Sequence, residues 1–183
     1  MHALHKILVY VPEVPMDIAC SRADMVLNIR DYAANMTEGY QGYVFDWRET
    51  DTAGRWSQIF PENVLLGSEG TSMIERELLE AAEAQKNELE ESIQSLAAWQ
   101  NGNVPQMAHN LWNIRADSTP DNLSEYLAPY MFLKIGKLVY GEYTFDSCFY
   151  DTCANTARIT EQTLEKVNAA PSEWALVLFD YHI

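Results

Sequence analysis

Two polar side chains, Asp180 and His182, stand at the end of an apolar run that closes the chain. The run covers residues 174–183 and has the length of a strand. Successive strand residues point to opposite faces, so these two side chains are predicted to share one face. A carboxylate beside an imidazole can serve general acid–base catalysis or bind a metal ion. The plainer alternative is a solvated histidine near the chain end.

A second polar group lies in residues 45–56, where a predicted strand runs into a loop that contains Gly54. Loops that follow strands are frequent places for functional sites. Asp46 is expected to be either paired with an arginine or exposed, because an unpaired buried carboxylate is costly. The structural alternative is an Asp–Arg pair that holds the loop. The candidate catalytic residues are Asp46, Arg48, Asp180 and His182.

Candidate binding residues fall in two places. Arg55 and Trp56 stand together in the polar loop, where an exposed ring and a guanidinium would suit a protein partner. The predicted helix that starts at Ser72 carries seven glutamates against one arginine and one lysine over residues 75–91. Regularly spaced carboxylates could imitate DNA phosphates, and the alternative is a solvated acidic face. The candidate glutamates are Glu77, Glu80, Glu88 and Glu91.

The sequence motifs of several large enzyme classes are missing. There is no G-x-x-x-x-G-K-[ST] loop, no G-x-G-x-x-G turn, no G-x-S-x-G elbow and no H-E-x-x-H pair. Cys148 and Cys153 lack a second pair of ligands for zinc, and His2 and His5 are expected on opposite faces of a strand. We therefore expect no metal site and no cofactor.

Composition narrows the classes of partner. The chain has 183 residues and a formal net charge of −15, with 48% hydrophobic residues, which is typical of one globular domain over residues 1–183. The charge disfavours direct contact with nucleic acid or an anionic membrane, and no segment has the apolar length of a membrane span. Three cysteines are an odd number, which argues against a disulfide framework and favours the cytoplasm. The oligomeric state is left open.

Apolar periodicity predicts an α+β fold. It indicates a small mixed or antiparallel sheet of about three to five strands, with the C-terminal strand central and several helices packed on one face. Strands are expected at residues 5–11, 43–48, 64–66, 142–149 and 174–183, and helices at residues 21–36, 72–96, 104–112, 120–138 and 154–168.

These observations favour a non-enzymatic protein-interaction or accessory protein, whose partner could be basic or DNA-binding. Two alternatives stay open. One is a small, hydrolase-like enzyme that uses the aspartate, arginine and histidine side chains at the strand ends. The other is a DNA mimic that inhibits a DNA-binding enzyme.

Overall fold

The computed structural model describes residues 2–17, 19–38, 45–101, 132–139, 149–150 and 159–182. The chain forms two compact units: residues 1–82 together with 144–183, and residues 83–143. The expectation of one domain over the whole chain stays a prediction. The helices predicted at residues 104–112 and most of that at 120–138 lie outside the described residues, although residues 132–139 are helical.

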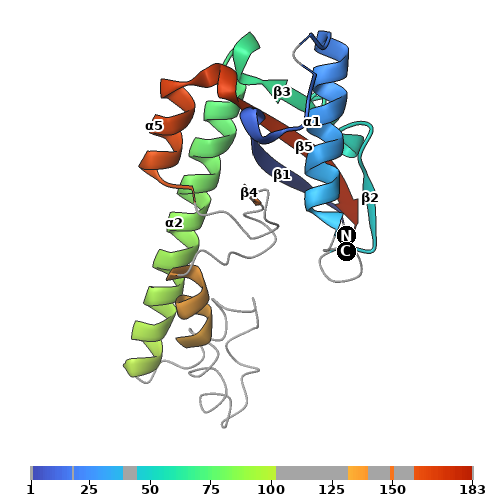
Figure 1. Cartoon of the computed structure of the whole chain (residues 1–183). Helices are drawn as coiled ribbons and strands as arrows, with labels where there is room; N and C mark the ends of the chain where they lie inside the picture. Colours follow the sequence, from blue (N-terminus) through green and yellow to red (C-terminus); the bar gives the residue numbers. More distant parts are fainter. Residues whose placement is uncertain are drawn as a thin grey trace. The chain divides into compact units, whose positions relative to one another are not determined.

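Within its described residues, the first unit is built on a mixed sheet of five strands, which Figure 1 shows between the helices. Strand β5 (Trp174–His182) pairs antiparallel with β1 (His2–Tyr10), β2 (Trp47–Glu49) and β3 (Val64–Leu66). Strand β4 (Phe149–Tyr150) pairs parallel with β1. The α+β fold class and the central position of the C-terminal strand are therefore confirmed.

Strand β5 is apolar on both faces, and this decides how the helices pack. Its residues 175–181 are all buried. Ala175, Val177, Phe179 and Tyr181 join one apolar cluster, whereas Leu176 and Leu178 join another. The prediction that helices cover only one face is therefore wrong, because a strand with two apolar faces needs cover on both.

Helix α1 (Arg22–Met36) covers the first face. The Ser21 hydroxyl accepts the Asp24 N–H and the Asp24 carboxylate accepts the Ser21 N–H, which is a capping box. Ile29 and Ala33 are buried against the sheet. The predicted helix with this start is confirmed.

Helices α2 (Ser72–Gln100) and α5 (Glu161–Ala169) supply the cover on the second face. In the first unit Ile74, Leu78 and Val167 share an apolar cluster with Leu176 and Leu178 of β5. The long helix is confirmed with its predicted start at Ser72, where the Thr71 carbonyl accepts the Glu75 N–H, and it extends four residues beyond the predicted end at residue 96.

Helix α5 starts later than predicted, because the Thr160 hydroxyl caps it by accepting the Thr163 N–H. Residues 154–158 of that prediction lie outside the described part of the chain. None of the helices within the described ranges combines the length and the apolar character needed to cross a bilayer.

Candidate functional site

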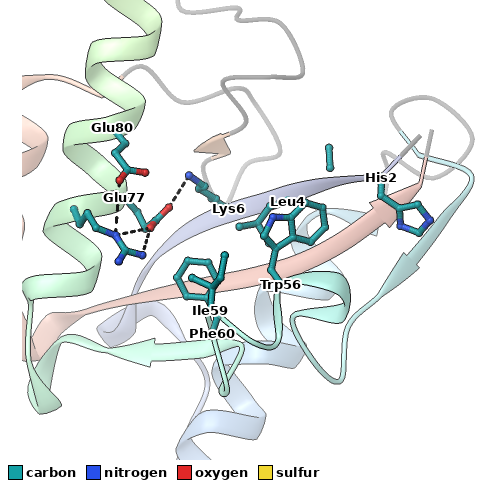
Figure 2. Close-up of a pocket in the computed structure, with 10 residues that line it drawn as sticks. His2, Leu4, Lys6, Trp56, Ile59, Phe60, Glu77 and Glu80 are labelled. Atoms are coloured by element: carbon teal, nitrogen blue, oxygen red, sulfur yellow. Dashed lines mark hydrogen bonds and ion pairs between the residues drawn. The ribbon is translucent and has the colours of Figure 1, made fainter.

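A groove of about 590 Å³ opens on the second face of the sheet in the first unit (Figure 2). Three segments line it: the start of β1, the end of the 3₁₀ helix Gly54–Trp56 with the turn that follows it, and the first turns of α2. Its lining residues are His2, Ala3, Leu4, Lys6, Trp56, Ile59, Phe60, Arg76, Glu77 and Glu80. We call this surface the groove.

One end of the groove is charged and held by ion pairs. Glu77 is buried, and its carboxylate accepts hydrogen bonds from Lys6 Nζ and Arg76 Nη2, each at 2.7 Å. Burial raises the pKa of this carboxyl, but the hydrogen bonds from Lys6 and Arg76 outweigh that effect and hold the pKa below its usual value. Glu80 stands 3.8 Å from Arg76 Nε and is mostly exposed.

The middle of the groove is apolar. Trp56 lies beside Leu4, and Ile59 and Phe60 follow it on the same turn (Figure 2). The Ile59 and Phe60 N–H groups both donate to the Trp56 carbonyl at 2.8 Å, which turns the chain tightly. Ile59 is 56% exposed, so the structure holds a large aliphatic side chain in water.

The far end of the groove carries a histidine held by a buried carboxylate. His2 Nδ1 donates to Asp180 Oδ1 at 2.8 Å, and the Asp180 side chain is only 3% exposed. The Arg55 N–H donates to the other oxygen at 3.0 Å. In the neutral ring only one nitrogen carries a proton. Because Nδ1 of His2 uses that proton to donate to Asp180, Nε2 is the nitrogen that can accept a proton.

A second Asp–His pair stands next to the first. His182 Nδ1 donates to Asp46 Oδ1 at 2.9 Å, and the two histidine rings lie 5.0 Å apart between centroids. The hydrogen bond from His182 lowers the pKa of Asp46. The sequence predicted that Asp46 would be either paired with an arginine or exposed, and its side chain is 66% exposed. The predicted shared face of Asp180 and His182 is also observed, since His2 contacts both.

Arg48 lies on the opposite face of the sheet from these pairs. Its guanidinium donates to Thr37 Oγ1 at 2.5 Å and to the Ala34 carbonyl at 3.0 Å, both at the end of α1. It also stacks 4.7 Å from the Phe45 ring centroid. The four candidate catalytic residues therefore do not converge, because Arg48 lies over Phe179 on the first face, whereas Asp46 and Asp180 bind the histidines.

A bend at Asp46 interrupts the strand predicted at residues 43–48. Strand β2 covers only Trp47–Glu49, and the Asp46 N–H donates to the His182 carbonyl at 3.0 Å just before it. The Phe45 ring lies beside His5 and Tyr181 on the first face, whereas the half-exposed Trp47 ring lies beside His2 at the groove, so the two rings do not share one side. Residues 43 and 44 lie outside the described residues.

The candidate binding residues are distributed between the two units. Trp56, Glu77 and Glu80 line the groove, and Arg55 is exposed beside it. In the second unit, Glu88 is mostly buried with Lys134 Nζ at 3.6 Å, and Glu91 is exposed. Burial of Glu77 removes one carboxylate from the row that a DNA mimic would present, and that hypothesis stays a prediction.

Sequence reasoning missed Lys6, Arg76 and His2 as members of one site. Lys6 offered a signal, since a lysine inside an apolar strand requires a nearby carboxylate. Its partner Glu77 comes from a helix 71 residues later, which no local pattern indicates.

The described residues contain no group of three or more His, Cys, Asp or Glu side chains arranged to hold a metal ion. His2 and His5 do face opposite sides of β1: His2 reaches Asp180, whereas His5 is fully buried against Tyr181. The chain matches no protein-family model, no curated protein and no solved structure.

Proposed function

We propose that this protein works by binding another protein and that the groove is its contact site. The observation that carries the proposal is that apolar side chains of the groove, above all Ile59, are exposed to solvent. They lie beside a charged end that is ordered by the ion pairs of Glu77 with Lys6 and Arg76. Large apolar residues that stay exposed around a concave surface are typical of protein-interaction sites.

The apolar surface extends beyond the groove itself. Trp47 is 51% exposed, and its ring lies 6.3 Å from that of His2 at the groove end. With Ile59 and the half-buried Trp56, it gives three large side chains on this face of the first unit. Tryptophan contributes strongly to interface energies, because it brings a large area with little conformational entropy to lose.

The charged end is already ordered before any partner arrives. Lys6, Glu77 and Arg76 hold one another, and the Arg76 guanidinium also lies 5.9 Å from the Phe60 ring centroid. A surface that is fixed in advance loses less entropy on association, which favours affinity.

Selection from a random peptide library tests this proposal. The intact chain serves as bait, and each selected peptide is then measured against Ile59→Glu, which places a charge in the groove. Leu27→Glu is the matched control, because Leu27 is also about half exposed but lies on α1, on the other face of the sheet. We expect peptides that lose at least tenfold in affinity to Ile59→Glu and keep their affinity for Leu27→Glu. A selection that yields no such peptide would refute the groove as a contact site.

The two Asp–His pairs favour a second candidate function, acid–base hydrolysis. A carboxylate that orients an imidazole is the arrangement of general-base sites, and His2 brings its ring to the groove. This reading replaces Arg48 with His2 in the hydrolase hypothesis.

Hydrolysis of p-nitrophenyl acetate distinguishes the two functions. Here His2 would take a proton from water as the water oxygen attacks the ester carbonyl, and acetate and p-nitrophenol would be released. A rate that falls at least tenfold in His2→Gln and in Asp180→Asn, but not in His5→Gln, would support the enzyme. Equal rates for wild type and His2→Gln would reject it.

A further inference from the structure

We infer that the occupant of the groove is a basic segment of a partner protein, in which an aliphatic or aromatic side chain neighbours a lysine or arginine. This inference rests on the proposed function, and it names the chemistry of the partner.

The apolar part of the groove selects the apolar side chain. The half-buried Trp56 and Leu4 form an apolar surface, Ile59 stands exposed at its edge, and Phe60 beside them is buried (Figure 2). A side chain laid there would cover rings and methyl groups that are now in contact with water, and removing that area from water is favourable.

The charged end of the groove determines the sign of the charge on the partner residue that neighbours the apolar side chain. Lys6 and Glu77 neutralise each other within the wall, with side chains that are mostly or fully buried. Arg76 already binds Glu77 at 2.7 Å and approaches Glu80 at 3.8 Å. Glu80 is 62% exposed, which makes its carboxylate the most accessible of the four charges at the mouth. A lysine or arginine of the partner can reach this carboxylate at little cost in desolvation.

The long-range field favours the same sign. The first unit contains eight Lys and Arg and 19 Asp and Glu, a balance of −11. Such a field raises the rate of encounter with basic partners and repels acidic ones, and salt screens it.

The exposure of the groove favours a protein segment over an enclosed small molecule. Ile59, Glu80 and Arg76 are each about half exposed or more, so the walls do not close over an occupant. Small-molecule sites usually bury about 70–90% of their ligand. A nucleic acid strand is disfavoured by the same negative field.

The test uses peptides selected on the intact chain, measured against Glu80→Lys, Glu80→Gln and the control Glu161→Gln. Glu161 is an exposed glutamate of the same unit, on α5 and away from the groove lining, so its neutralisation changes the net charge equally. We expect the selected peptides to carry lysine or arginine beside the apolar residue. Their affinity should fall about two- to fivefold in Glu80→Gln, fall further in Glu80→Lys, and stay unchanged in Glu161→Gln.

The outcomes separate this inference from the proposed function. Peptides that depend on Ile59 but are acidic or uncharged, or that bind Glu80→Lys as well as wild type, overturn the basic partner and leave the contact site standing. A selection with no peptide that depends on Ile59 overturns both. Rising salt should weaken peptide binding more in wild type than in Glu80→Lys. If the affinity falls equally in both, the role of Glu80 is also overturned.

Discussion

Replacement of Gly54 by alanine tests whether the buried carboxylate of Asp180 is held in the one position that the fold allows. Gly54 has φ +53°, in the left-handed region that favours glycine. A Cβ built at this residue would stand 2.3 Å from both Cβ and Oδ2 of Asp180. Asp180 would have to move away from His2 and from the Arg55 N–H.

The cost follows from two contributions. The left-handed conformation costs an alanine about 1–2 kcal/mol. Weakening the hydrogen bonds to a charged group that is 3% exposed adds about 1.5–3 kcal/mol. The free energy of unfolding should therefore fall by roughly 2.5–5 kcal/mol, which lowers the unfolding temperature by about 10 °C in a chain of this size.

Urea and thermal unfolding followed by circular dichroism measure this loss. Gly70→Ala is the matched control, because Gly70 has φ +144° but a Cβ there would meet nothing within 4 Å. It should lose only the backbone contribution of about 1–3 kcal/mol. Gly136→Ala, where a Cβ also meets nothing, should be neutral or gain up to about 1 kcal/mol. The reasoning is refuted if Gly54→Ala loses no more stability than Gly70→Ala.

Three further substitutions test the charged and buried groups. Burial, with a contribution from Arg48, lowers the pKa of His5 to about 3, below its ordinary value of 6.5, so the unfolded chain binds more protons between these values. The free energy of unfolding should therefore fall as pH drops below 6.5, by up to about 1.4 kcal/mol per pH unit. His5→Phe should flatten this slope in urea unfolding at pH 4.5–6.5, and an unchanged slope would contradict the role of His5. Glu77→Gln should lose about 3 kcal/mol at pH 7 in the same assay, because Lys6 and Arg76 lose a buried partner. Since the pKa of Glu77 is lowered on folding, wild type should lose this advantage as pH falls below 4.5, and a constant difference down to pH 3 would reject the ion pair. Arg48→Lys should lower the free energy of unfolding by about 1–3 kcal/mol, because one ammonium cannot stack on Phe45 and also donate to both Thr37 and the Ala34 carbonyl. Equal stability of the variant and the wild type in thermal unfolding would show that the charge alone matters.

Local pattern was enough to predict the main elements. The capping box at Ser21 and Asp24, the long amphipathic helix from Ser72 and the apolar run before His182 each depend on residues a few positions apart. The composition of β5 also contained the reason for its central position, since residues 174–179 are apolar at both alternating positions and such a strand must be covered on both faces. The expectation of helices on one face missed that same consequence.

Only the tertiary structure decided which side chains meet in the groove. Lys6 finds Glu77 across 71 residues, and His2 finds Asp180 across 178, through the antiparallel register of β1 with β5. Arg48 and Asp46, two residues apart, were separated by a bend that a backbone hydrogen bond to His182 holds. Sequence determines the period of each element and the composition of each face. Register, bends and the packing of α2 on the sheet arise from contacts between distant segments, and these bring the charged and apolar residues of the groove together.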